Sequence, residues 1–339
     1  MARSKSFFGL RTGSTKSLTF QVYRGQQITK DRVYRVSNPR TEAQMKQRAI
    51  IPIVAAARSA LKGLIDHSFE GVPYGEASLK EFSKQNLRAG ALSVTSYSPN
   101  GVSNPGFADL IVSNGSINVP YKLRSSYNTN SVTSDGQTLP WFKFPQVNQG
   151  DSADVIFKYL ETYARTNNAA LIAPGTQLSF LTIYQSGTVK VNTGTGTIEA
   201  PTAGFALNRI YIPNGDSDSE NAKAINDQWK VNKAHTQNSD RAELINSNGD
   251  TLDIYTTDDN KVKISCRTKV ASQSNNCGMA LILSRYENGV WKRSPSRLTI
   301  GFEPTNKYSF EDWLSTYKTT GAASKKYLNT GDESTGIQG

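Results

Sequence analysis

The chain contains little cysteine and little histidine, with two residues of each among 339. Two cysteines cannot make a disulfide framework, so we expect Cys266 and Cys277 to be reduced thiols in a strand pair. The histidines, His67 and His235, lie far apart and have no cysteine or acid at the spacing of a metal site. These shortages argue against a disulfide-stapled domain and against histidine-based metal binding or catalysis.

The chain also lacks the short motifs that carry common enzyme chemistry. It has no Gly-x-Ser-x-Gly, no His-Glu-x-x-His and no Walker sequence. The glycine pair in Gly194-Thr195-Gly196 lies between β-type segments, which is typical of a turn and not of a phosphate loop. We therefore expect no enzyme activity, no catalytic residues, no metal site and no cofactor.

Long apolar runs are missing as well. No run reaches the roughly 18 residues that a membrane span needs, so we expect no membrane partner. The opening MARSKSFFGLRTG is basic but has no apolar core segment, which makes a secretory signal unexpected. The sequence is that of a protein made and assembled in a cytoplasm.

Acidic residues are scarce in the first 64 positions. This stretch has thirteen Lys and Arg against Asp31 and Glu42, a net charge of +11, whereas the other 275 residues carry 26 charges of each sign. Such asymmetry indicates that one end meets an anionic or acidic partner while the rest is a neutral scaffold. Three interpretations stay open: contact with an acidic protein neighbour, contact with nucleic acid phosphates, or a solvated basic surface.

What the chain has in quantity is aromatic and small polar residues. Fifteen Tyr, thirteen Phe and four Trp can build a core, while Ser, Thr, Asn and Gly dominate the polar remainder. This composition favours short strands, turns and long surface loops, as in β-rich virion and adhesin-like proteins.

The first 90 residues show a basic arm, a strand pair and helices. Residues 18–36 alternate apolar and polar positions and are predicted to form two extended segments joined near Gly25. Asn38-Pro39 stops the second segment, and Thr41 is a candidate cap for a helix that Pro52 should kink or split. A second helix is expected over 76–88.

After residue 91 the pattern becomes mainly β-type. Residues 124–150 are expected to form a long ordered loop, followed by a helix over 152–166 and a short helix around 220–229. On the first of these helices the predicted inner face is Val155, Ile156, Tyr159, Leu160 and Tyr163. Asn288-Gly289 is a strong hairpin signal. The expected strands are 92–94, 107–112, 117–119, 177–185, 187–192, 206–212, 252–256, 261–267, 278–286 and 290–300.

This order predicts an α+β protein. We expect a basic arm, strand pair and helices in residues 1–90, and a β-rich, Ig-like or sandwich-like domain in 91–320 with an inserted helix near 152–166. A flexible tail is expected in 321–339. Just before it, Phe310, Trp313 and Tyr317 could pin the C-terminus onto a sheet.

Two acidic clusters have competing interpretations. Asp216-Ser217-Asp218-Ser219-Glu220 has alternating acids that could suit a hard cation, but it lacks the spacing and glycine of a calcium loop. A solvated loop with acids at a helix start is the favoured interpretation. Asp258-Asp259 is most simply a turn.

The run TFQVYRGQQITKDRVYRVSNPRTEAQMKQR (19–48) resembles the N-terminal signature of an uncharacterised family of Bacteroidota and their phages, including crAss-like phages. The signature pairs Tyr23-Arg24-Gly25 with the segment from Pro39 to Arg48, and the resemblance covers about the first third of the chain. Phe69-Glu70-Gly71, Phe107-Ala108-Asp109 and Val112-Ser113-Asn114-Gly115 are similar too. The chain departs from the family at Thr12–Lys16, where members have Gly-Lys-x-Gly, and it is longer than most members.

The resemblance implies a phage structural protein without catalytic residues. With the charge asymmetry, it predicts a virion subunit of a ring, collar, tail, head–tail connector or head surface, assembled in the bacterial host cytoplasm. Its expected partners are other virion proteins and copies of itself, and packaged nucleic acid is a further possible contact. The expected interface residues are Arg24, Arg32, Arg35, Arg40 and Arg48.

Two other functions fit parts of the sequence. A nucleic-acid-binding protein would use the basic segment, with salt-sensitive affinity. A carbohydrate-binding or adhesion module would use exposed aromatic residues, for which Trp141, Phe142 and Trp291 are the candidates.

Overall fold

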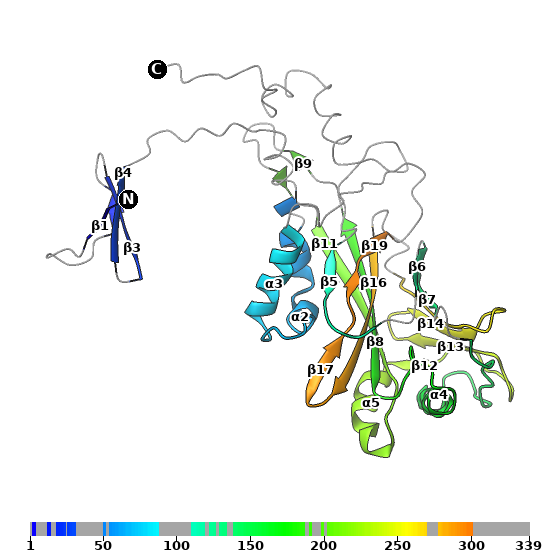
Figure 1. The fold of residues 1–339 in the computed structure, drawn as a ribbon. Helices are drawn as coiled ribbons and strands as arrows, with labels where there is room; N and C mark the ends of the chain where they lie inside the picture. The colour runs from blue at the N-terminus through cyan, green and yellow to red at the C-terminus, as the bar shows by residue number, and fades with distance from the viewer. Residues whose placement is uncertain are drawn as a thin grey trace.

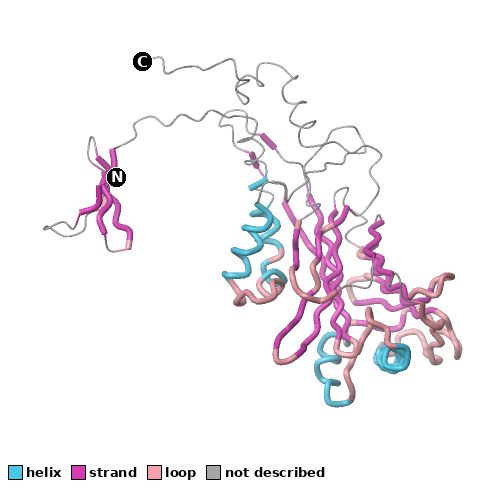
Figure 2. The backbone as a smooth tube through the Cα atoms, in the orientation of Figure 1, coloured by secondary structure: helices cyan, strands magenta, loops and turns pink. Residues whose placement is uncertain are grey.

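The structure is a computed structural model, and it confirms the α+β class: several antiparallel sheets are combined with short helices (Figure 1). Strands make up most of the molecule's centre and the helices lie around them (Figure 2). The residues that the structure describes are 2–4, 12–14, 18–24, 26–31, 50–51, 54–87, 110–118, 122–126, 129–133, 138–186, 190–191, 198–199, 202–269 and 277–300.

The N-terminal residues form a four-stranded antiparallel sheet. Its strands are β1 (Ala2–Ser4), β2 (Gly13–Ser14), β3 (Leu18–Tyr23) and β4 (Gln26–Asp31), in the order β1-β4-β3-β2. The pair β3–β4 confirms the predicted strand pair with its turn near Gly25. In Figure 1 this sheet lies apart from the other described elements.

A second sheet forms the centre of the molecule. It has the order β11-β8-β16-β17, with β19 also paired to β16. Its strands are β8 (Thr176–Ser186), β11 (Thr202–Tyr211), β16 (Cys277–Glu287), β17 (Val290–Arg293) and β19 (Thr299–Ile300). The predicted hairpin is confirmed, since Asn288 and Gly289 both have positive φ, at 53° and 80°, between β16 and β17.

Both faces of the central sheet are buried. Along β8, Leu178 and Phe180 point into one core while Leu181 and Ile183 point into another, because successive side chains alternate between the faces of a strand. The second of these cores contains helical residues 54–60, α2 (Lys62–Ile65), α3 (Glu76–Leu87), β5 (Ile111–Ser113) and Leu298 after β18 (Ser296–Arg297). The helices predicted for the N-terminal part thus pack directly on the β-rich part.

One of the two helix predictions in this region can be compared with the structure. The expected helix over 76–88 is confirmed as α3, whose Leu79 and Phe82 are buried. Pro52, expected to kink the preceding helix, lies outside the described residues, and the described helical turns are interrupted at Leu61 instead.

The other face of the central sheet packs on a six-stranded sheet, in the sandwich-like arrangement that we expected. Its order is β12-β13-β14-β15-β7-β6. The strands are β6 (Lys122–Ser126), β7 (Thr129–Thr133), β12 (Trp229–Val231), β13 (Arg241–Asn246), β14 (Thr251–Thr256) and β15 (Val262–Arg267). The predicted loop over 124–150 is therefore wrong in its first part. Part of this polar segment forms strand β7 because it pairs with the distant strand β15, with Val132 opposite Ile264.

Helix α4 (Asp154–Asn167) confirms the helix predicted over 152–166 and packs into the core between the two sheets. The predicted inner face is confirmed at Ile156, Leu160 and Tyr163 and is wrong at Val155, which is 48% exposed, while Phe157 is fully buried. The N-cap residue is Ala153, which makes no side-chain hydrogen bond as a cap. At the other end Asn168 takes a left-handed conformation and ends the helix.

The remaining short elements lie after the long strands of the central sheet. They are β9 (Lys190–Val191), β10 (Ile198–Glu199), the 3-10 helix η1 (Asp216–Asp218) and α5 (Ser219–Asn226), which confirms the short helix expected around 220–229. The predicted strand 187–192 is only represented by β9, which pairs with β10.

The two cysteines do not share a strand pair, contrary to prediction. Cys266 lies in β15 of the six-stranded sheet and Cys277 begins β16 of the central sheet. Cys266 is a free thiol, as expected, and its burial raises the pKa of the thiol. Deep in the core, this cysteine serves as a small apolar residue.

Candidate docking interface

The N-terminal sheet has two chemically different faces. Paired residues of an antiparallel sheet point to the same side, so the register of β3 and β4 assigns every side chain to a face. One face carries the apolar residues Leu18, Phe20 and Val22 together with an acid, and the other carries Ile28 and Tyr23 among polar residues, with a base and no acid. The first face is Leu18, Phe20, Val22, Gln27, Thr29 and Asp31, and the second is Thr19, Gln21, Tyr23, Gln26, Ile28 and Lys30.

The apolar side chains of this sheet are only partly covered. Phe20 and Val22 are half-buried, and Tyr23 is 54% exposed. Among the described residues, the buried apolar side chains begin at Ile50. A small sheet gains its stability by burying an apolar face, and this sheet still has apolar area that further packing could bury.

Arg24 lies at the tip of this sheet, in the turn between β3 and β4. It has a φ of 50°, which is uncommon for a residue with a side chain, and its guanidinium carbon lies 5.4 Å from the centre of the Tyr23 ring. Both side chains are exposed. The turn thus presents an arginine and a tyrosine together, two residue types that are enriched at the energetic centres of protein interfaces.

Of the five predicted interface residues, Arg24 is the one that the structure describes. Arg32, Arg35, Arg40 and Arg48 lie outside the described residues, as do the helix start after Pro39 and the C-terminal residues Phe310, Trp313 and Tyr317.

The structure brings together two of the segments that resemble the phage family. Phe69 and Asn114 form a bridge, and the Glu70 amide donates to the Asn114 carbonyl at 2.9 Å. Glu70 is also bonded to Ser116, through both its amide and its hydroxyl, and to Lys292 and the Arg293 amide of β17. A Cβ atom on Gly115 would lie 2.3 Å from the Arg293 carbonyl oxygen, so this position requires glycine. These segments hold the helical layer to the β16–β17 hairpin and have a structural role.

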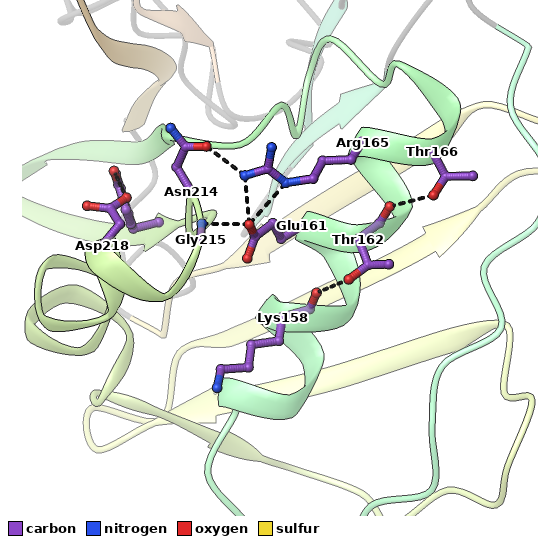
Figure 3. A network of polar contacts seen from close by, with 9 residues as sticks. Lys158, Glu161, Thr162, Arg165, Thr166, Asn214, Gly215 and Asp218 are labelled. Atoms are coloured by element: carbon purple, nitrogen blue, oxygen red, sulfur yellow. Dashed lines mark hydrogen bonds and ion pairs between the residues drawn. The ribbon is translucent and has the colours of Figure 1, made fainter.

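The polar cluster around Asp216 is also structural. Glu161 of α4 accepts from the Gly215 amide at 2.7 Å and from Arg165 at 2.9 Å, and Arg165 donates to Asn214 at 2.7 Å (Figure 3). Asp218 accepts a hydrogen bond from the Tyr211 hydroxyl. These contacts fix the loop before α5 onto α4. The favoured interpretation of a loop with acids at a helix start fits this geometry.

The remaining candidate residues do not form a common site. His67 is exposed and packs edge-on against Tyr74, whereas His235 pairs its backbone with Val147 in another part of the chain. Asp259 accepts from Thr257 within a tight turn. In the part of the chain that the structure describes, no group of three or more His, Cys, Asp or Glu side chains could hold a metal ion.

The three aromatic residues proposed for a carbohydrate site do not share one surface. Phe142 is buried, and Trp291 packs against Tyr286 on the β16–β17 hairpin. Trp141 is 41% exposed and lines a groove with Asn238, Ser239 and Asp240, which the sequence analysis did not single out. No local signal connects those residues to Trp141, because they lie almost 100 positions further along the chain.

Comparisons with known proteins identify no relative. No family model matches the chain, and neither a curated protein nor a solved structure is similar to it. Within the described residues, no helix is long and apolar enough to cross a membrane.

Proposed function

We propose that this chain is a structural subunit of a phage virion that docks on neighbouring subunits through its basic N-terminal segment. The observation that carries the proposal is the N-terminal sheet, whose apolar residues stay partly exposed within the first 64 residues, the stretch that holds the whole net charge of the protein. The resemblance of residues 19–48 to a family of Bacteroidota and their phages is the reason for proposing a phage virion.

Charge and apolar surface have different tasks in such a docking element. Phe20 and Val22 are already half-buried, so burying the rest of each side chain against a neighbour gains less than the about 1.5–3 kcal/mol of a fully exposed one. The basic residues keep the free segments of different copies apart and direct the segment to an acidic surface. Copies of this chain and other virion proteins are the proposed partners.

Charge reversal on the β3–β4 pair tests the proposal. Sedimentation of the full chain is compared with that of an Arg24→Glu/Lys30→Glu variant, across protein concentration and at low salt. We expect the variant to weaken association with itself, or with virion proteins from purified particles, by at least about tenfold. Lys80→Glu/Lys223→Glu is the matched control, because it makes the same change in net charge at two exposed lysines of other elements. Equal association of both variants, or absence of the chain from particles examined by mass spectrometry, would contradict the proposal.

Nucleic-acid binding is the second candidate, favoured by the +11 charge of the first 64 residues. A gel shift with duplex DNA at about 50 mM and 200 mM salt separates the two candidates. A phosphate-binding segment loses affinity by orders of magnitude over this range. A segment devoted to protein contacts retains DNA only weakly at both salt concentrations.

A further inference from the structure

A groove lies between the loop that carries Trp141 and two turns of the six-stranded sheet. It has a volume of about 950 Å³, within the range of about 300–1,000 Å³ that is usual for ligand sites. One wall is the segment 138–143, and the other consists of Asn238, Ser239, Asp240 and Asn260.

Backbone hydrogen bonds and buried side chains fix the wall that carries Trp141. Leu139 donates its amide to the Asn260 carbonyl at 2.9 Å, and Phe142 donates its amide to the Thr256 hydroxyl at 3.1 Å. The Leu139 and Phe142 side chains are buried. Trp141, between them, therefore stays 41% exposed on a fixed backbone, and a ligand that stacks on it meets a surface that needs little ordering.

The opposite wall is joined to the same loop. The Phe144 amide donates to the Ser239 carbonyl at 2.8 Å, and the Asn238 amide donates to the Phe144 carbonyl at 3.0 Å. The Lys143 amide donates to the Tyr159 hydroxyl at 2.9 Å, which ties the loop to α4 as well. Both walls of the groove thus keep their spacing without a ligand.

The chemistry of the lining selects the class of ligand. An exposed indole next to Pro140 offers a flat apolar surface, while Thr138, Asn238 and Asn260 offer neutral hydrogen-bonding groups. Among the described residues, the lining has one acid, Asp240, and one base, Lys143, so this part of it is neutral and favours neither an anion nor a cation. A ligand that fits has apolar C–H faces and many hydroxyl groups, and a sugar chain has both.

We propose that this groove binds a neutral oligosaccharide, stacked on Trp141 and hydrogen-bonded by the amide side chains of the facing turns. The inference is independent of the docking role proposed for the N-terminal sheet, because the two surfaces have no residue in common.

The test begins with the full-length protein on an array of neutral and acidic glycans. Calorimetric titrations then use soluble neutral oligomers of glucose, galactose, mannose and N-acetylglucosamine. We expect at least one neutral glycan to bind and Trp141→Ala to weaken its binding by at least about tenfold. Tyr286→Ala, which removes another exposed aromatic side chain, is the matched control and should bind like the wild type.

A second variant removes an amide without straining the backbone. Asn238 has a φ of 67°, a conformation that glycine adopts freely, so Asn238→Gly deletes the side chain and keeps the turn. We expect it to weaken binding several-fold while its thermal melt stays close to that of the wild type. The inference is wrong if the wild type binds no neutral glycan, if it binds only acidic glycans, or if both variants bind as tightly as the wild type. Trp141-dependent binding of an apolar peptide in place of a glycan would also overturn it.

Discussion

At the scale of single residues, Glu70 shows how a charged group can hold two layers of the fold together. Burial raises the pKa of its carboxyl, but hydrogen bonds from Lys292, Ser116 and the Arg293 amide outweigh burial and lower the pKa to about 2. The carboxylate is therefore stabilised in the folded protein more than in the unfolded chain. Its partners lie on β17 and beside β5, so the contact joins segments from three parts of the sequence.

Glu70→Gln should destabilise the protein in a pH-dependent way. We expect a cost of about 1–3 kcal/mol at pH 7, since a charged acceptor with several donors is lost. Because the folded pKa of Glu70 is depressed, its contribution is present above the usual pKa of a glutamate and fades as the pH falls toward 2. Urea unfolding of both proteins at pH 7 and pH 3 should thus show a smaller difference at pH 3. An equal difference at both pH values would show that the ionised carboxylate is not the cause.

At the scale of elements, α4 shows why an amphipathic pattern locates a helix better than it orients one. Residues 154–167 are helical as expected, and Ile156, Leu160 and Tyr163 are buried as expected. Val155 and Phe157 are both apolar, and the sequence does not say which of them lies inside. In the folded protein Phe157 is the buried one of the two, because its ring packs in the core between the two sheets.

A matched pair of alanine variants tests this orientation of α4. Phe157→Ala should cost about 3–5 kcal/mol, the usual range for a fully buried phenylalanine. Val155→Ala should change stability by less than about 0.5 kcal/mol, because the side chain is largely exposed. Chemical unfolding measures both values. Similar costs for the two variants would mean that α4 is rotated relative to the structure described here.

At the scale of the whole molecule, the N-terminal sheet differs from the rest of the described chain. The described residues from Ile50 onward contain both apolar cores, while the described apolar side chains of the N-terminal sheet belong to neither core. Within the described residues, neither core therefore depends on a side chain of the N-terminal sheet.

Deletion of residues 1–49 should leave the remaining protein folded. We expect its melting temperature to change by less than about 4 °C, the shift that about 1 kcal/mol causes in domains of this size. Calorimetry or circular dichroism measures the change, and the same preparation serves in the association experiments. A loss of the cooperative transition would show that the N-terminal sheet is part of the folding unit.

The sequence by itself determined the features that depend on neighbours along the chain or on charge. It located the concentration of basic residues, the β3–β4 pair, helix α3, the extent of α4 and the Asn288-Gly289 hairpin, because turn residues and periodicity act over a few positions. Of the candidate interface, it also pointed to Arg24 beside Tyr23.

Only the tertiary structure decided the features whose parts lie far apart in the chain. Strand β7 looks like loop in sequence and is a strand because β15 supplies the facing hydrogen bonds. The Trp141 groove exists because backbone hydrogen bonds place the loop around residue 141 beside the turn at Asn238. In both cases the stabilising partner lies more than 90 residues away in the chain. A short window of sequence does not include that partner, so local propensity alone does not predict the structure that forms.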